Sequence, residues 1–280
     1  MFVKTGLYWR IKSWVQHGVP SILILYGPPG CGKTETMRQV VMEYPGKAFW
    51  ITATRATNLE ALFGHWELRG SETVFVPGEL FEALQTRGAL IVIDDAHLVA
   101  PDLQLLNGLG DSTRRVTVPV LSKTIEIAEG VKLVLIANPP PRTVASWERD
   151  QWIIPEQIRD RARVIRVDQG LTPDEELRIA YQAFPRESEA LVEHVVELAR
   201  NLRKNGVLSS FTPSLRSILM LGNLLRQGLS LGEAYLEAIA YKFDDPDEFA
   251  VAVEAFKAKF GTDPRDGFRT TLSEGATHEA

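Results

Sequence analysis

The sequence contains a single cysteine, Cys31, among its 280 residues. One thiol cannot form an internal disulfide, and this fits a reducing compartment. No apolar run approaches the roughly 18 residues that a membrane-spanning helix needs. The N-terminus also lacks a cationic stretch followed by an apolar core. We therefore expect a cytoplasmic protein with no membrane span and no signal peptide.

An excess of charge of one sign is also missing, since the formal net charge is -5. This balance gives no global attraction to nucleic acid or to anionic lipid. The histidines His65, His97 and His194 are scattered, and no cluster of His, Cys and acidic residues has metal-ligand spacing. We therefore predict no zinc site.

Short apolar runs alternate with helical patterns in the first part of the chain. The runs lie at 21–27, 47–54, 89–95, 131–138 and 163–167. Continuous buried strands that alternate with helices are typical of a parallel sheet covered on both faces. A helix is expected around 101–109, between the third and fourth runs. The pattern predicts an α/β three-layer sandwich with a five-stranded parallel sheet over residues 1–168.

From Thr172 onward the pattern becomes wholly helical. "TPDEE" places a helix N-cap before a proline and acidic residues of the first turn. Helices are expected over 187–205, 213–227, 231–242 and 247–260, with glycines as stops. These patterns predict a helical lid domain over 169–262 and a flexible tail over 263–280.

A phosphate-binding loop follows the first apolar run. "GPPGCGKT" fits G-x-x-x-x-G-K-[ST] and lies between an expected strand and an expected helix. Its glycines let backbone N–H groups surround a phosphate, and Lys33 reaches the β- and γ-phosphates. Thr34 offers a hydroxyl to Mg²⁺. The predicted ATP-binding residues are Gly27, Pro28, Pro29, Gly30, Cys31, Gly32, Lys33 and Thr34.

Two adjacent carboxylates end the third apolar run. Ligands of parallel sheets lie at the carboxyl ends of the strands, so Asp94 and Asp95 are expected beside the phosphate loop. Asp94 fits the residue that holds Mg²⁺, and Asp95 fits the residue that polarises the attacking water. The alternative is a helix-capping role for either acid. Motor ATPases usually carry glutamate at this position, and aspartate is one methylene shorter. We therefore expect a working but slow ATPase.

Together these segments resemble the AAA+ ATPases, from about Val19 to Lys242. Within that family they resemble the MoxR branch with its CbbQ/NorQ and gas-vesicle relatives, close to the dynein/midasin type. "GPPGCGKT" is similar to Walker A, and the segment 62–97 is similar to that branch's insert leading into Walker B. "LVLIANPP" resembles sensor 1, and "FTPSLRSILML" resembles the lid motif. "IPEQIRDRARVIRV" resembles the arginine-finger segment, although Ala162 replaces the usual aromatic residue.

The resemblance assigns roles to four further residues. It implies that Asn138 holds the attacking water or the γ-phosphate together with Asp95. It implies that Arg161, or Arg159 in its place, reaches a neighbouring subunit's nucleotide, and that Arg216 senses ATP from the lid. The alternatives are a strand-end turn for Asn138 and solvated surface positions for the arginines.

An arginine that acts on a neighbour requires head-to-tail assembly, and the family forms hexameric rings. The resemblance therefore implies a homo-hexamer that remodels a protein client, with a von Willebrand factor A domain protein as a candidate partner. Expected hairpins near Glu67–Val76 and Val116–Ile127 are either pore- or client-facing surfaces or sheet-edge decoration. Trp50, Trp66, Trp147 and Trp152 are interpreted as core or interface residues.

Two other functions compete with the remodelling ATPase. A nucleic-acid motor is suggested by "DDAH", which resembles a helicase box, and by basic residues at 114–115 and 200–204. The acidic total, the lack of a second RecA-like unit and the lack of an aromatic–basic groove argue against it. The other alternative is a nucleotide-dependent switch with weak turnover, which follows if Asp95 is an incompetent base.

Overall fold

The computed structural model describes residues 2–19, 21–140, 152–167, 171–184, 189–205, 208 and 210–266. The chain forms two compact units, Lys4–Gly170 and Leu171–Ala280 with Met1–Val3. Each unit has its own hydrophobic core. The expected domain limits at 168 and 262 stay a prediction. Trp147 and the tail beyond residue 266 lie outside the described residues.

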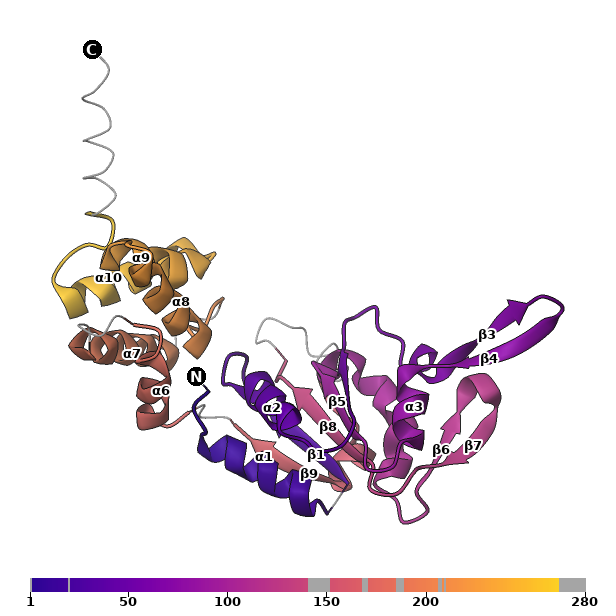
Figure 1. Cartoon of the computed structure of the whole chain (residues 1–280). Coiled ribbons are helices and arrows are strands. Elements are labelled where there is room, and N and C mark those ends of the chain that lie inside the picture. The colour runs from indigo at the N-terminus through magenta and orange to yellow at the C-terminus, as the bar shows by residue number, and fades with distance from the viewer. Residues whose placement is uncertain are drawn as a thin grey trace. The chain divides into compact units, whose positions relative to one another are not determined.

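The first unit is built on five parallel strands in the order β2-β5-β8-β1-β9 (Figure 1). They are β1 (Ile22–Tyr26), β2 (Ala48–Thr52), β5 (Leu90–Asp94), β8 (Lys132–Ala137) and β9 (Ala162–Arg166). Every residue of β5 is buried, as the second strand from an edge requires when both faces are covered. The predicted α/β class and the five-stranded parallel sheet are confirmed.

Helices cover both faces of this sheet. One face packs on α3 (Glu79–Gln85), α5 (Glu156–Asp160) and the 3₁₀ element η2 (Ala96–Leu109), where Ile93 and Leu133 join Leu103 in one core. The helices α1 (Gly6–His17) and α2 (Lys33–Met42) pack against each other. Because right-handed crossovers that run in opposite directions along the sheet fall on opposite faces, α2 covers the other face.

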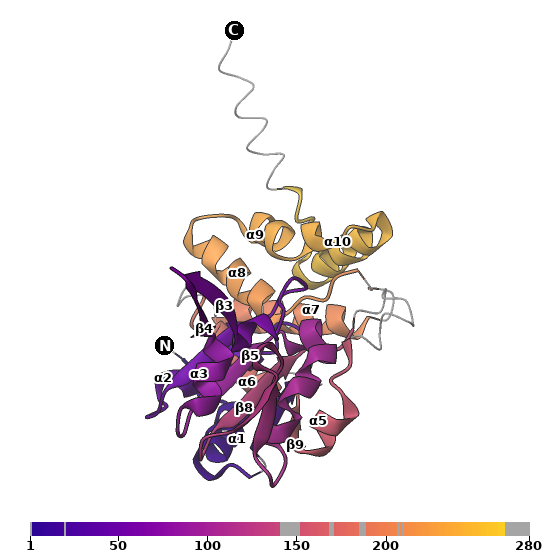
Figure 2. The same cartoon turned by 90° about the vertical axis from the view of Figure 1, so that its right-hand side faces the viewer.

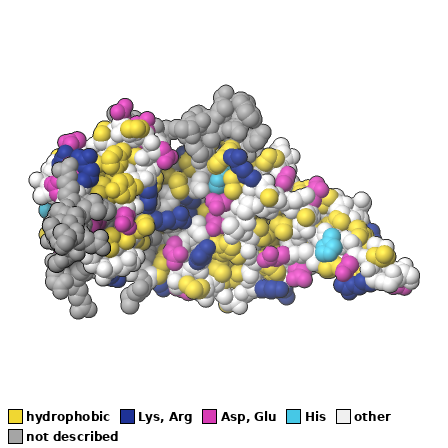
Figure 3. Space-filling view, turned by 90° about the horizontal axis from the view of Figure 1, so that it is seen from above, with side chains coloured by type: hydrophobic (Ala, Val, Ile, Leu, Met, Phe, Trp, Pro, Cys, Tyr) yellow, Lys and Arg dark blue, Asp and Glu magenta, His cyan; other side chains and the backbone are white. Residues whose placement is uncertain are grey.

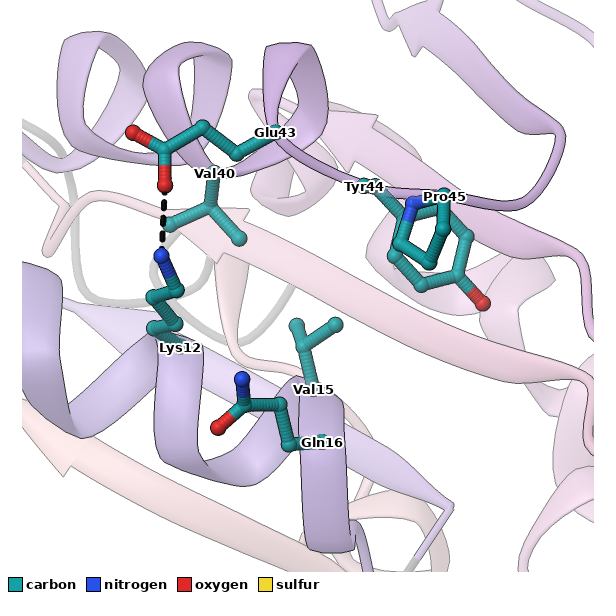
Figure 4. A pocket seen from close by; sticks show the side chains of 7 residues that line it. All are labelled: Lys12, Val15, Gln16, Val40, Glu43, Tyr44 and Pro45. Atoms are coloured by element: carbon teal, nitrogen blue, oxygen red, sulfur yellow. Dashed lines mark hydrogen bonds and ion pairs between the residues drawn. The ribbon is translucent and has the colours of Figure 1, made fainter.

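A pocket marks the contact between α1 and α2. Figure 4 shows Lys12 of α1 reaching Glu43, just beyond the end of α2, with Val15 and Val40 facing each other. Tyr8 also donates its hydroxyl proton to Glu43. These contacts lower the pKa of Glu43, with the Lys12 hydrogen bond as the largest cause. The pocket is lined by none of the predicted nucleotide-binding residues.

Two hairpins extend from the α/β unit, as expected. One is β3 (Gly64–Arg69) with β4 (Glu72–Pro77), and the other is β6 (Arg115–Val118) with β7 (Lys123–Glu126). The indole N–H of Trp66 donates to the Val120 carbonyl, at 3.1 Å, which joins the two hairpins. Trp66 and Leu68 are 51% and 72% exposed. Figure 3 shows hydrophobic side chains interspersed with charged ones toward this end of the unit.

The second unit is a bundle of helices. Its elements are α6 (Pro173–Ala180), α7 (Glu189–Lys204), α8 (Leu215–Arg226), α9 (Leu231–Ala238), η6 (Ala240–Lys242) and α10 (Pro246–Phe260). Thr172 caps α6 through a reciprocal hydrogen bond with Glu175. Figure 2 shows α8, α9 and α10 grouped together. In the described part of the chain, no helix combines the length and the apolar character needed to cross a membrane.

Candidate functional site

The loop Gly27–Thr34 joins β1 to α2 at the carboxyl end of the sheet. Gly30 and Gly32 have φ angles of 75° and 88°, which glycine adopts at little cost. Gly32 is the N-cap of α2 and offers no side-chain hydrogen bond to the helix. The first N–H groups of α2 are therefore not capped by Gly32, and the partial positive charge of the helix end favours an anion there.

Lys33 is the cationic group of the loop, and only 4% of it is exposed. Its Nζ donates to the carbonyls of Gly27 and Pro28, both at 2.7 Å, and to Cys31 Sγ at 3.4 Å. Burial lowers the pKa of Lys33 from its usual value. A phosphate would supply both negative charge and better acceptors to this amine, so the residues present fit a polyphosphate.

Asp94 ends β5 and lies against the same loop. The hydroxyl of Thr34 donates to Asp94 Oδ1 at 3.1 Å, although the two residues are 60 positions apart. Asp94 is 6% exposed, and burial raises the pKa of its carboxyl. A cation bound at this oxygen pair would reverse that effect.

Mg²⁺ fits this oxygen pair. Mg²⁺ binds through few protein oxygens, and phosphates and water complete its coordination, so a hydroxyl and a carboxylate suit it. Among the described residues, no three or more His, Cys, Asp or Glu side chains form a group that could hold a metal. The oxygens of Thr34 and Asp94 fit an ion whose other ligands come from nucleotide phosphates and water.

Asp95 stands in an uncommon backbone conformation, with φ 54° and ψ 36°. Its Oδ1 accepts a hydrogen bond from the side-chain amide of Asn138, at 3.3 Å. Asn138 directly follows β8, the strand between β5 and β1. The structure therefore brings together two residues, 43 positions apart, that the sequence predicted as partners at one site.

Three residues beside this pair were missed from the sequence. His97 Nδ1 accepts a hydrogen bond from the backbone N–H of Asn138, at 3.3 Å. The His97 ring stacks on Trp152 with centroids 4.8 Å apart, and the Arg55 guanidinium lies 5.9 Å from the Trp152 ring. These side chains come from three segments that are distant along the chain, so no local spacing could have connected them.

The two candidate finger residues lie at the end of α5. Arg161 donates from Nε to Asp111 Oδ1 at 2.7 Å and from a terminal nitrogen to the Gln157 carbonyl at 2.9 Å. Arg159 is exposed. Its side chain makes no hydrogen bond or ion pair with another described residue. Which of the two acts on a neighbour stays a prediction.

Arg216 belongs to the helical unit. It is an exposed residue of the first turn of α8, which Ser214 caps. Its assigned role as an ATP sensor stays a prediction.

A comparison with known protein families gives a match within the α/β unit. Residues 22–150 match the AAA domain of the dynein-related subfamily. This match supports an AAA+ ATPase. It includes the phosphate loop, Asp94, Asp95 and Asn138, whereas Arg159, Arg161 and Arg216 lie beyond it.

Relatives extend the similarity past the matched AAA domain. An uncharacterized protein of Staphylococcus epidermidis is 26% identical over 251 residues, covering 85% of this chain and 90% of the relative. Uncharacterized proteins of Staphylococcus haemolyticus and Staphylococcus aureus are 24% and 25% identical, with the same coverage. The similarity therefore covers more of the chain than the α/β unit alone contains.

Proposed function

We propose that the protein is a magnesium-dependent ATPase of the MoxR branch of the AAA+ family, working as a homo-hexameric ring on a protein client. One observation carries the catalytic part of this proposal. Two hydrogen bonds, from Thr34 to Asp94 and from Asn138 to Asp95, converge on the carboxyl ends of neighbouring strands beside the phosphate loop. This arrangement supports the proposal of a metal-holding pair and a water-activating pair beside one phosphate-binding loop.

The residues divide the work of hydrolysis as follows. Lys33 and the loop N–H groups would hold the β- and γ-phosphates, while Thr34 and Asp94 would hold Mg²⁺. Mg²⁺ held there would supply positive charge to the phosphate oxygens. Asp95 accepts a proton from water as the water oxygen bonds to the γ-phosphorus and the bond to the bridging oxygen breaks. Asn138 orients the carboxylate of Asp95 and the water.

Phosphate release by the wild type and by Asp95→Asn tests this division. The substitution keeps the size and the backbone preference of residue 95 but removes the base, so kcat should fall at least ~100-fold. Affinity for ATP should stay within ~2-fold, because Asp95 is not a phosphate ligand in this scheme. Equal, slow phosphate release by both proteins would instead favour the nucleotide-dependent switch.

The proposal also covers assembly into a ring and binding of a protein client. Arg161 or Arg159 would complete a neighbouring subunit's site, and Arg216 would respond to ATP from the lid. The exposed Trp66 and Leu68 support a client- or pore-facing role for the β3–β4 hairpin. A von Willebrand factor A domain protein remains the proposed class of partner. Mass measurements with and without a slowly hydrolysed ATP analogue test the ring, and a monomer under both conditions would contradict it.

A further inference from the structure

His97 occupies a buried position between the two acids and the end of β8. Only 4% of it is exposed, and it lies in the first turn of η2, directly after Asp94 and Asp95. Its Nδ1 accepts the backbone N–H of Asn138 at 3.3 Å. The side chain of the same Asn138 donates to Asp95 Oδ1, also at 3.3 Å. The backbone N–H of Asn138 therefore binds His97, while its side-chain amide binds Asp95.

A second set of contacts fixes the imidazole ring. Trp152 stacks on it at an interplanar angle of 29°, and the Arg55 guanidinium lies 5.9 Å from the indole on which the imidazole stacks. Arg55 follows β2, whereas Trp152 precedes α5. A ring held by stacking keeps its acceptor nitrogen aimed in one direction, which a freely rotating side chain would not.

We propose that His97 is a positioning residue for ATP hydrolysis, which sets Asn138 and through it the carboxylate of Asp95. This inference rests on the proposed function, because it concerns the geometry of the same hydrolytic site. His97 acts through Asn138 and not on the substrate. Its loss should therefore lower the rate of the chemical step while leaving nucleotide binding intact.

The hydrogen bond defines the form of the imidazole. A nitrogen that accepts a hydrogen bond from a backbone N–H carries a lone pair, so His97 is neutral with its proton on Nε2. The charged groups that act on it are Asp95 and Lys33, which have opposite signs. The neutral ring can hold Asn138, whereas a protonated ring would direct a donor at a donor.

Two substitutions separate the acceptor from the ring. Asn places its side-chain oxygen where His places Nδ1, so His97→Asn keeps the acceptor and loses the stacked ring. His97→Phe keeps a ring for Trp152 and loses the acceptor. Groups that orient catalytic residues typically contribute ~10–100-fold to activity, so His97→Phe should lower kcat by about that factor. His97→Asn should retain kcat within ~3-fold of the wild type, and neither variant should change nucleotide affinity by more than ~2-fold.

A surface variant, a measurement of hydrogen exchange and a substitution of Trp152 test whether the effect is specific to the His97 acceptor. His194→Phe makes the same change on the exposed surface of α7 and should leave kcat unchanged. Amide hydrogen exchange at Asn138 should accelerate in His97→Phe and not in His97→Asn, because only the former loses the acceptor. If His97→Phe does not fold, Trp152→Ala, which frees the ring, should lower kcat about 3- to 10-fold.

The outcomes that overturn the inference differ from those that overturn the proposed function. Full kcat in folded His97→Phe, or equal losses in His97→Asn and His97→Phe, would show that the acceptor does not matter. When Trp152→Ala must replace His97→Phe, an unchanged kcat would have the same meaning. A wild-type protein that binds nucleotide but releases no phosphate would overturn the proposed function, and the positioning role with it.

Discussion

At the scale of single residues, the backbone of Asp95 explains why this position carries aspartate. Its φ of 54° places it in the left-handed region, where aspartate and asparagine are enriched over other side chains except glycine. Glutamate adopts this region of φ and ψ less readily than aspartate. The shorter arm thus suits the turn between β5 and η2.

This geometry predicts a stability difference between two substitutions. Asp95→Glu should lower the free energy of unfolding by about 1 kcal/mol, because glutamate is less tolerant of positive φ. Asp95→Asn should be close to neutral for the same reason. Urea unfolding of both variants measures the difference, and equal stabilities would contradict the role assigned to the backbone.

His97 predicts a dependence of stability on pH. Burial lowers the pKa of His97 below its ordinary value of 6.5, with Asp95 opposing and Lys33 assisting the shift. The unfolded chain then binds a proton below about pH 6.5 while the folded chain resists it. Stability contributed by His97 is therefore present above this pH and is lost as the pH falls toward the lower folded-state pKa.

Unfolding free energies at pH 7.5 and pH 5.5 would measure this contribution. The wild type should lose more stability over this interval than His97→Asn, which cannot take up the proton. The same loss in both proteins would mean that other groups account for the pH dependence.

At the scale of elements, much of the fold followed from hydrophobic patterning, since β1, β2, β5 and β8 are mostly apolar, whereas β9 at the sheet edge carries two arginines. The sequence also indicated that Asp94 and Asp95 lie beside the phosphate loop, because parallel strands bring their carboxyl ends to one edge. The partnership of Asp95 with Asn138 was implied by the family resemblance. The 101–109 segment was expected to be a single helix. The segment is helical, as the part of the 3₁₀ element η2 that follows a kink at Val99.

The sequence could not indicate contacts between segments that are distant along the chain. The contacts of Trp152 with His97 and with Arg55 require three distant segments to meet, and none of these segments carries a periodic signal. The ion pair of Arg161 with Asp111 is of the same kind. Such contacts arise from tertiary packing and leave no mark in local spacing.

The helical unit contains a buried charge that predicts a large effect. Glu176 of α6 has a side chain only 3% exposed and pairs with Arg200 and Arg203 of α7. Because Glu176→Ala would leave two partly buried cations without their partner, it should destabilise this unit by ~3 kcal/mol. Asp174→Ala, in the exposed first turn of the same helix, should cost under ~1 kcal/mol. Thermal unfolding compares the two, and similar losses would contradict a structural role for the buried cluster.

At the scale of the whole molecule, two units with separate cores form one chain, and relatives share most of its length. The phosphate loop and the residues proposed for metal binding and water activation, Asp94, Asp95 and Asn138, lie within the α/β unit. We therefore expect nucleotide binding to be a property of this unit, whereas Arg216 and the two finger candidates are proposed to couple the site to the lid and to neighbouring subunits. In the proposed ring, neighbouring subunits would regulate hydrolysis at a site whose proposed phosphate-binding and metal-binding residues all belong to one chain.

The central claim is that ATP and Mg²⁺ bind together between the loop 27–34 and Asp94, and calorimetry with ATP tests it most directly. The wild type should bind ATP more tightly with Mg²⁺ than without it. Lys33→Ala should weaken binding at least ~10-fold, whereas Lys47→Ala, an exposed lysine outside the loop, should not. Binding that ignores Mg²⁺, or equal affinity in the wild type and folded Lys33→Ala, would contradict the account.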